Sequence, residues 1–243
     1  MSGAMLELDA VRRVFGTGRG ATTALDGVSL SVAAGELVAI MGPSGSGKST
    51  LLTLAGGLDR PTSGGVRVGD ADLATSDAEA LARLRRRTVG YVFQDLNLLP
   101  TLTAVENVAV PLELDGASAR AARREAHEAL AAVGLAGLAD RFPDALSGGE
   151  QQRTAIARAC VGPRRLLLAD EPTGALDSLA GEQVLAVLRE RADAGLAVVL
   201  VTHEARYAAW ADRVVFLRDG RAQDQAGPPA GPETLLADSD VTP

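Results

Sequence analysis

The residue best suited to chemistry is Lys48, the only lysine among 24 lysines and arginines in the chain. It lies in residues 42–49, which fit the pattern G-x-x-x-x-G-K-[S/T] at every fixed position. Glycines let backbone N–H groups approach phosphate oxygens, and a compact ammonium fits such a loop where a planar guanidinium is too wide. The sequence therefore predicts a phosphate-binding loop formed by Gly42, Pro43, Ser44, Gly45, Ser46, Gly47, Lys48, Ser49 and Thr50.

The segments on either side of this loop support the interpretation. Residues 37–41 form a continuous apolar run typical of a buried strand, and residues 50–55 are typical of a helix. The motif requires this order, because the helix N-terminus adds a partial positive charge that attracts anions. The alternative is a glycine-rich turn with a stray lysine, which chance produces in about one chain in a hundred. The flanking pattern makes that alternative rarer still.

A second candidate is the acidic pair Asp170 and Glu171, which follows the apolar run of residues 166–169. Carboxylates at the C-terminal end of a buried strand lie at the edge where open α/β sheets bind ligands. Asp170 is suited to hold Mg²⁺ together with the Ser49 hydroxyl, and Glu171 can face a water in line with the terminal phosphate. An acidic pair alone is commonly a solvated strand end, but the phosphate loop makes that alternative the weaker one.

The elements expected to position these residues alternate between strands and helices, which indicates a parallel α/β sheet. Buried strands are expected at residues 37–41, 89–93, 166–170 and 197–201, and a helix at 178–194. Short β-like segments are expected between residues 5 and 34, with a turn at Asp26-Gly27, and between residues 64 and 73. A hairpin is expected around Asp219-Gly220.

Capping residues mark the remaining helices. Residues 76–79 predict a capping box that opens a helix through residue 87, and residues 147–150 predict another that leads to Cys160. Thr103 and Glu106 mark a third helix, and Ser118 opens an alanine-rich helix to about residue 133. We therefore expect the helices at residues 95–158 to form an insertion into an α/β nucleotide-binding core at residues 1–94 and 159–225, followed by a flexible tail at 226–243.

Residues 146–153, Leu-Ser-Gly-Gly-Glu-Gln-Gln-Arg, resemble the signature sequence of the ATP-binding cassette (ABC) ATPases, which other phosphate-loop proteins lack. The resemblance covers about residues 5–225 and implies the α/β P-loop NTPase fold of an ABC nucleotide-binding domain, with an antiparallel β subdomain and an inserted α-helical subdomain. In this family two subunits pair head to tail around two ATP molecules. The resemblance implies that Ser147 and Gly149 contact the γ-phosphate bound to Lys48 of the opposite copy. The further residues implied to bind ATP are Gly148, Glu150 and Asp177. Locally, Ser147 and Glu150 could simply cap their own helix, and the two roles are compatible.

Four further positions match the family one by one. Gln94 is similar to the glutamine that senses Mg²⁺ and water and links to the transport partner. Asp177 lies in a stretch similar to the loop that crosses the dimer interface, and His203 is similar to the switch histidine that contacts the γ-phosphate. Phe15 takes the place of the aromatic residue that stacks on adenine. Taken alone, Phe15 could equally be core packing, and His203 a packed polar residue at a strand end.

The resemblance implies ATP and Mg²⁺ as cofactors and assigns roles to these residues. The implied catalytic residues are Lys48, Gln94, Glu171 and His203, and the implied Mg²⁺ ligands are Ser49, Gln94 and Asp170. Two departures from the commonest pattern bear on nucleotide affinity: Glu150 replaces the usual glutamine, and Phe15 replaces the more usual tyrosine.

Composition limits the other possibilities. The net charge is −7 and no basic stripe is visible, which disfavours a nucleic-acid partner. Cys160 is the only cysteine, so the chain suits a reducing compartment. The apolar runs are too short to span a membrane, and the N-terminus lacks the pattern of a signal peptide. We therefore expect a cytoplasmic protein, and the resemblance implies that a permease holds it at the inner face of the cell membrane.

Residues 94–108 and 171–177 are similar to the macrolide-exporter and lipoprotein-releasing branch of the family, whose members work with membrane proteins that transmit force. The resemblance implies an ATP-hydrolysing transporter subunit that acts as a homodimer on a permease. One alternative is a soluble cassette ATPase of DNA repair, chromosome handling or translation, although the coiled coils, zinc modules and tandem cassettes of those relatives are not seen here. The other is an ATP-dependent regulator of a cell-wall or division complex.

Overall fold

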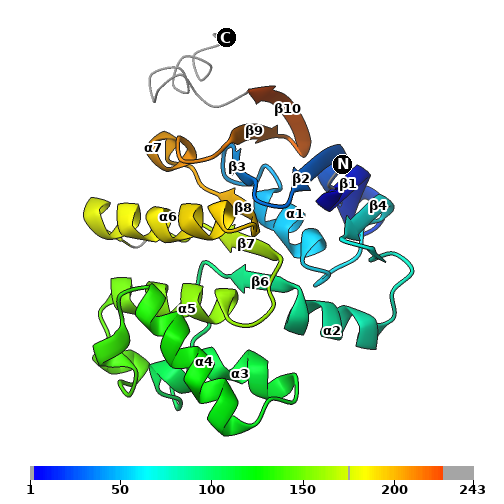
Figure 1. Cartoon of the computed structure of the whole chain (residues 1–243). Coiled ribbons are helices and arrows are strands. Elements are labelled where there is room, and N and C mark those ends of the chain that lie inside the picture. Colours follow the sequence, from blue (N-terminus) through cyan, green and yellow to red (C-terminus); the bar gives the residue numbers. More distant parts are fainter. Residues whose placement is uncertain (1–2, 175, 227–243) are drawn as a thin grey trace.

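The computed structural model describes residues 3–174 and 176–226, and these residues form two sheets with helices packed around them (Figure 1). The larger sheet has the strand order β10-β9-β3-β8-β7-β6, and the smaller one has the order β2-β1-β4-β5. Strands of the larger sheet are β3 (Leu37–Met41), β6 (Val89–Val92), β7 (Leu166–Asp170), β8 (Ala197–Val201), β9 (Arg213–Arg218) and β10 (Arg221–Ala226). Neighbouring strands are parallel apart from β9 and β10, which confirms the expected parallel sheet.

The smaller sheet is antiparallel throughout. Its strands are β1 (Ala4–Phe15), β2 (Thr22–Ala33), β4 (Ser63–Val68) and β5 (Ala71–Asp72). The described helices are α1 (Lys48–Ala55), α2 (Ala78–Arg87), α3 (Ala104–Leu114), α4 (Ala119–Ala132), α5 (Gly148–Cys160), α6 (Ser178–Asp193) and α7 (Ala205–Ala208). The same part of the chain also contains short 3₁₀ helices at Gly18–Gly20, Ala136–Leu138 and Pro143–Ala145. No helix in the described part of the chain combines the length and hydropathy needed to cross a bilayer.

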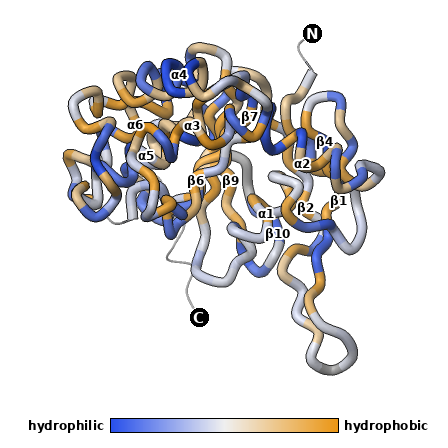
Figure 2. The backbone as a smooth tube through the Cα atoms, turned by 90° about the horizontal axis from the view of Figure 1, so that it is seen from below, coloured by the Kyte–Doolittle hydropathy of each residue, from blue (hydrophilic) through white to orange (hydrophobic). Residues whose placement is uncertain are grey.

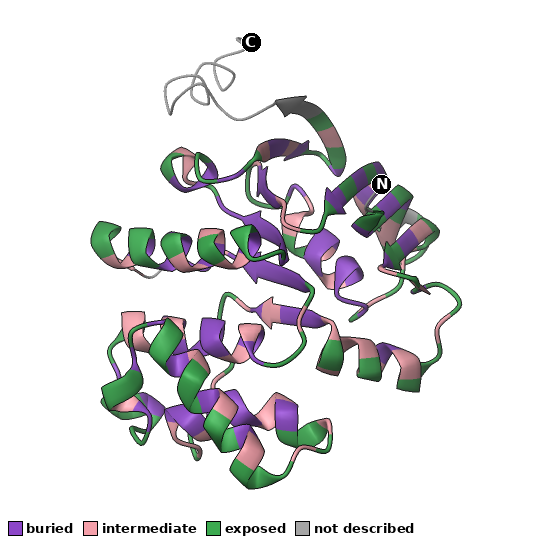
Figure 3. Cartoon of the chain, viewed as in Figure 1, coloured by how far each residue is buried: buried purple, intermediate pink, exposed green. Residues whose placement is uncertain are grey.

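The parallel sheet divides the hydrophobic core into two layers, because successive side chains of a strand point to opposite faces. On β3, Leu37, Ala39 and Met41 join the core formed with α3, α4, α5 and α6. Val38 and Ile40 join the core formed with α1 and the antiparallel sheet. Every residue of β3, β7 and β8 is buried, as Figure 3 shows for the strands at the centre of the molecule. In Figure 2 the central strands are correspondingly hydrophobic, whereas the outward part of α4 is hydrophilic.

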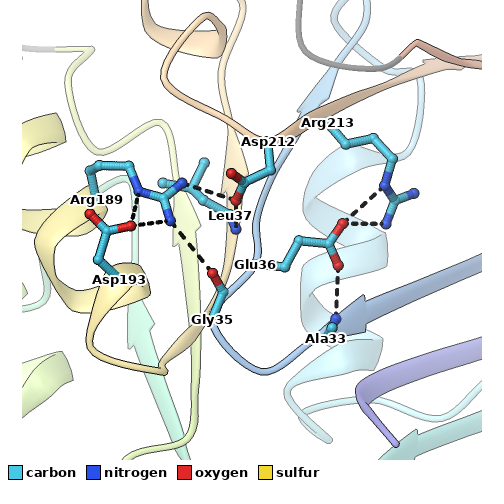
Figure 4. Close-up of polar contacts among 8 residues, drawn as sticks. All are labelled: Ala33, Gly35, Glu36, Leu37, Arg189, Asp193, Asp212 and Arg213. Atoms are coloured by element: carbon cyan, nitrogen blue, oxygen red, sulfur yellow. Dashed lines mark hydrogen bonds and ion pairs between the residues drawn. The ribbon is translucent and has the colours of Figure 1, made fainter. Parts of the chain in front are cut away.

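A network of charged side chains fixes the edge of the sheet where β3 begins (Figure 4). Asp212 accepts hydrogen bonds from the Leu37 N–H at 2.8 Å and from Arg189 of α6 at 2.9 Å. Glu36 accepts from the Ala33 N–H at 2.8 Å and from Arg213 at 3.1 Å. These contacts tie the start of β3 to α6 and β9. Because the start of the strand is fixed, the phosphate loop at its other end is held in place as well.

Two local predictions are wrong. β2 runs unbroken through Asp26 and Gly27, where a turn was expected. Gly27 has φ of 75° at a register shift against β1, so it forms a bulge within the strand. The helix expected to be capped by Ser76 is capped instead by Asp77, whose carboxylate accepts from the Ala80 N–H at 2.7 Å. Ser76 lies one residue before this cap, and its hydroxyl donates to the Asp72 carbonyl.

The helical insertion is visible as the group α3, α4 and α5 at the bottom of Figure 1, while β1, β2 and β4 lie at the right. Helices α3 and α5 both pack against α4 and against each other. The boundaries of this subdomain at residues 95 and 158 remain a prediction, and α5 itself continues to Cys160. The predicted tail begins at the end of β10, and its residues 227–243 lie outside the described part of the chain.

Candidate active site

The phosphate loop connects β3 to α1 and requires glycine at two of its positions. Gly42 and Gly47 have φ of 150° and 103°. A Cβ atom on Gly42 would lie 2.0 Å from the Leu217 carbonyl oxygen, and one on Gly47 would lie 2.3 Å from that of Ala24. Larger residues are therefore excluded by close backbone approach. Gly47 is also the N-cap of α1 and has no side chain to cap it, which leaves the first N–H groups of the helix for an anion.

Lys48, the first residue of α1, points back along the loop. Its Nζ donates to the carbonyl oxygens of Gly42 at 2.8 Å and Pro43 at 2.9 Å. These two contacts hold the ammonium over the loop where phosphate oxygens are expected. A phosphate group can therefore replace or join the carbonyl oxygens without a large movement of the lysine.

The acidic pair lies at the C-terminal end of β7, next to the end of the neighbouring strand β8. Asp170 ends β7 and is buried, and burial raises the pKa of its carboxyl group, although a hydrogen bond from Ser49 acts in the opposite direction. Glu171 follows with φ of 48°, a left-handed conformation that residues other than glycine rarely adopt. Its N–H donates to the Val201 carbonyl of β8, and its Oε2 lies 2.9 Å from Nδ1 of His203. The backbone of β7 and β8 thus brings Glu171 and His203 together.

These groups share one cleft of about 530 Å³. The side chains and backbone that line it belong to Ser44, Gly45, Lys48, Ser49, Gln94, Asp95, Gln152, Asp170, Glu171, Gly174 and His203. The cleft contains all four predicted catalytic residues and all three predicted Mg²⁺ ligands. A hydroxyl, an amide oxygen and a carboxylate are oxygen donors of the kind Mg²⁺ prefers, and Ser49 and Asp170 are close enough to hydrogen bond. Among the described residues, no group of three or more His, Cys, Asp or Glu side chains is arranged to hold a metal.

Three residues that line the cleft were not predicted as part of the site: Asp95, Gln152 and Gly174. Gln152 is 4 % exposed, and its Nε2 has no hydrogen-bond partner in the described part of the chain. A buried amide of this kind is unusual. The signal available in the sequence was a polar residue of the signature, Gln152, on the apolar face of the helix that the signature begins.

Several predicted ATP-binding residues do not line the cleft of their own chain. Phe15 ends β1, is 43 % exposed and lies under the Arg13 guanidinium, so it is not a core residue. Ser147 and Glu150 form both halves of a capping box at the exposed N-terminus of α5. The hydrogen bonds from Ser147 lower the pKa of Glu150. Asp177 caps α6 by accepting from the Ala180 N–H at 2.8 Å.

The chain is similar in sequence and in structure to known proteins. Residues 25–174 match the protein family described as ABC transporter. The chain belongs to the ABC transporter family. The solved structures it resembles include the dimeric, post-hydrolysis form of the ATP-binding cassette MJ0796 bound to ADP and Pi. That chain is 40 % identical and superimposes with a TM-score of 0.87, over 93 % of this chain and all of that one. A second dimeric structure of MJ0796, described as a bacterial ABC transporter cassette, has a TM-score of 0.86. These findings confirm the predicted fold class and the prediction of an ATP-hydrolysing ABC cassette.

Curated relatives are larger than this cassette. The macrolide export ATP-binding/permease protein MacB of Chromobacterium violaceum is 48 % identical over 95 % of this chain, which covers 36 % of that protein. MacB of Escherichia coli (strain K12) is also 48 % identical, over 89 % of this chain and 33 % of its own length. The chain thus spans about a third of the length of these relatives. The matches confirm the resemblance to the macrolide-exporter branch and favour a transporter cassette over the two alternatives.

Proposed function

We propose that two copies of this cassette close around two Mg-ATP molecules and that closure and hydrolysis drive a membrane permease of an exporter or force-transmitting type. The observation that carries the proposal is that the predicted ATP-site residues lie in two separate places on the chain. Lys48, Glu171 and His203 share one cleft, whereas Ser147 presents its helix N-terminus outside that cleft. Helix N-termini with exposed N–H groups bind anions. A second copy, placed head to tail, would bring its Ser147 to the phosphates held by Lys48.

ATP binding in this scheme uses groups already in position. The phosphate loop and Lys48 bind the β- and γ-phosphates, with Lys48 turning from the Gly42 and Pro43 carbonyls that hold it now. Mg²⁺ held by Ser49, Gln94 and Asp170 would supply positive charge beside the phosphate oxygens. The exposed ring of Phe15 is available to stack on adenine. Most of the rate enhancement then comes from fixed positive charge around the transferring phosphoryl group.

Hydrolysis is assigned to Glu171 and His203. The Glu171 carboxylate, oriented by His203 at 2.9 Å, accepts a proton from a water molecule in line with the γ-phosphate. The water oxygen forms a bond to phosphorus as the bond to the bridging oxygen of ADP breaks, so that ADP and inorganic phosphate are released. The separated products repel each other electrostatically, which opens the pair of cassettes.

A second concave region suits the permease. A groove of about 400 Å³ lies between α2, β6, α3 and α5. Its apolar lining includes Leu58, Tyr91, Phe93, Pro111 and Leu114, and the other lining residues include Arg85, Arg86, Arg158 and Arg164. Leu58 and Leu114 are 46 % and 68 % exposed, which is costly unless a partner covers them. We infer that a cytoplasmic helix of the permease, apolar on one face and acidic at its margin, docks here and holds the cassette at the inner face of the membrane.

Cross-linking between copies tests the head-to-tail arrangement. Ser44 lines the cleft and Ser147 begins the signature helix, and both are exposed. We expect a Ser44→Cys/Ser147→Cys variant, treated with ATP and a short bismaleimide, to give a covalent dimer on a denaturing gel. Burial raises the pKa of the Cys160 thiol to about 11, so the native cysteine reacts slowly. Ser118→Cys in place of Ser147→Cys is the control, because Ser118 is an exposed N-cap of another helix. No ATP-dependent dimer, or equal dimer in the control, would contradict the arrangement.

Co-purification tests the permease. The cassette isolated from detergent-solubilised membranes should carry an integral membrane protein that mass spectrometry identifies as a transporter permease. Leu114→Asp should lose this protein, and Leu179→Asp should retain it. The two leucines are matched, at 68 % and 69 % exposed, but Leu179 lies on α6 away from the groove lining. Equal retention by both variants would remove the groove from this role.

A further inference from the structure

The loop that follows Gln94 has an unusual backbone conformation. Leu96 and Asn97 have φ of 56° and 49°, in the left-handed region that residues other than glycine seldom adopt. Such a conformation persists only where surrounding contacts hold it. Gln94 precedes Leu96 by two residues and lines the ATP cleft. Contacts that hold Leu96 and Asn97 therefore also determine where the Gln94 side chain lies.

Arg158 of α5 makes those contacts. Its Nη1 donates to the Asn97 carbonyl oxygen at 2.6 Å, and its Nη2 donates to the Leu96 carbonyl oxygen at 2.5 Å. A planar guanidinium presents two N–H groups side by side, an arrangement that the ammonium of lysine cannot reproduce. Hydrogen bonds from a charged donor are also stronger than those between neutral groups. One side chain thus fixes two consecutive carbonyl groups of a strained loop.

Arg158 also lines the groove assigned to the permease, as do Phe93 and Ala159. Arg158 therefore has one side toward the groove and its hydrogen bonds toward the loop that leads to the ATP cleft. A helix that enters the groove packs directly on this side chain. Any movement of the guanidinium changes the position of the two carbonyl groups that it holds.

We propose that Arg158 is the positioning residue through which an occupied groove sets the placement of Gln94 in the ATP cleft. The proposal rests on the proposed function, since it presupposes that Gln94 serves ATP hydrolysis. It adds a physical connection within one chain, which runs from the groove through the Arg158 guanidinium and the carbonyl groups of Leu96 and Asn97 to Gln94. Arg158 itself does not line the ATP cleft, so it acts on hydrolysis through the loop.

Arg85 provides a matched control. It lines the same groove, and its Nη1 donates to a single carbonyl oxygen, that of Gly57, at 2.7 Å. Gly57 follows α1 and is not part of the loop after Gln94. Arg158→Lys and Arg85→Lys therefore remove the same chemical group from the same groove and keep the positive charge. Only the first change removes the contacts to Leu96 and Asn97.

Amide hydrogen exchange of the intact protein, without nucleotide, measures the contact directly. We expect Arg158→Lys to speed exchange at residues 95–99 by roughly tenfold, as for the loss of one charge-assisted hydrogen bond. Arg85→Lys should leave these residues unchanged. Equal exchange in Arg158→Lys and the unaltered protein would overturn the positioning role. This measurement does not depend on hydrolysis.

A double-mutant cycle then tests the connection to Gln94. The rate constant kcat, the KM for ATP and the Mg²⁺ concentration for half-maximal activity are measured for Arg158→Lys, Gln94→Ala and the double variant. We expect Arg158→Lys to lower kcat by about tenfold and to raise the Mg²⁺ requirement, with little change in KM. The double variant should have the same kcat as Gln94→Ala alone, because both changes remove the same function. Additive losses would overturn the proposal, whereas an inactive unaltered protein would contradict the proposed function instead.

Discussion

The ammonium of Lys48 is held by two carbonyl oxygens of its own loop, Gly42 at 2.8 Å and Pro43 at 2.9 Å. A point charge with three rotatable donors can keep one such contact while it turns to a phosphate oxygen. A guanidinium is wider and carries its donors in one plane, so it cannot occupy the same space between the loop and a phosphate. The shape of the cation, and not its charge alone, therefore matters at this position.

Replacement of the lysine tests this statement. We expect Lys48→Arg to lower kcat for ATP hydrolysis by about a hundredfold or more, similar to the loss of one group that stabilises the transition state. The melting temperature should change little, because the side chain is partly exposed and contacts only its own loop. Steady-state kinetics and thermal unfolding measure the two effects. A fully active Lys48→Arg variant would show that charge alone is sufficient.

In the proposed function the Glu171 carboxylate accepts the proton from water. Replacing this carboxylate should therefore slow hydrolysis without weakening ATP binding. Glu171→Gln keeps the shape of the side chain and can still hydrogen bond to His203, but it cannot accept the proton at neutral pH. We expect kcat to fall by about a hundredfold to ten-thousandfold, with ATP affinity maintained. Equilibrium binding and single-turnover hydrolysis distinguish the two. Unchanged hydrolysis would remove Glu171 from the role.

Local spacing was sufficient to predict Lys48 and its loop, because the motif lies within nine consecutive residues. The hydrogen bond between Glu171 and His203 could not be predicted in the same way, since the residues are 32 positions apart. It depends on β7 and β8 being neighbours in the sheet, which is a property of the tertiary structure. The resemblance placed both residues in one site without indicating that they touch. Gln152 was missed because a single polar residue within a helix carries little local signal.

At the scale of elements, helix starts were predicted well where the capping residue has one choice of partner. Ser147 forms the expected capping box, and Thr103, which was expected to cap a helix, forms one too. The prediction for Ser76 failed because Asp77, an equally good N-cap residue, follows it directly, and the helix begins after Asp77. The bulge at Gly27 was read as a turn because a glycine after an aspartate favours both. The choice between them depends on β1, which pairs on either side of the bulge.

Ser147 is the N-cap of α5, and in the proposed function it also contacts the phosphates bound by a second copy. We expect Ser147→Ala to lower the free energy of unfolding by about 1 kcal/mol, as for other N-cap serines. Ser118→Ala, which removes the N-cap of α4, should have a similar effect on stability. Only Ser147→Ala should weaken ATP-driven association, measured by light scattering. If the two variants associate equally, Ser147 acts only as a helix cap.

At the scale of the molecule, the two ends of the parallel sheet differ. The ATP cleft lies at the C-terminal ends of β7 and β8, and the network around Asp212 and Glu36 lies where β3 begins. Alternating strands and helices were sufficient to predict the sheet and the edge that carries the site. The strand order was not predictable from pattern alone, because β3 lies between β8 and β9, which are more than 150 residues away in the chain.

The Asp212 network makes stability depend on pH. Partial burial acts to raise the pKa of Asp212, but hydrogen bonds from the Leu37 N–H and Arg189 outweigh it, and the net pKa is lowered. The folded protein therefore binds this proton less readily than the unfolded chain. The stabilisation is fully present above the unfolded pKa of about 3.9 and is lost as the pH falls toward the folded value.

Asp212→Asn tests that dependence. We expect the free energy of unfolding at pH 7 to fall by roughly 1 kcal/mol, a value that allows for solvent screening of a half-exposed carboxylate. The loss of stability between about pH 5 and pH 3 should become shallower than in the unaltered protein. Asp193→Asn is the control, because Asp193 contacts the same Arg189 but does not accept from the Leu37 N–H. Urea denaturation across this pH range would contradict the account if Asp212→Asn showed the original slope.

The central claim is that each working site needs two copies of the chain, and sedimentation velocity tests it most directly. Glu171→Gln should sediment as a monomer without nucleotide and as a dimer with ATP, while Glu171→Gln combined with Lys48→Ala should remain monomeric. In the unaltered protein, ATP hydrolysis per chain should rise with protein concentration over the range where the dimer forms. Hydrolysis at full rate by a species that stays monomeric at every concentration would contradict the account.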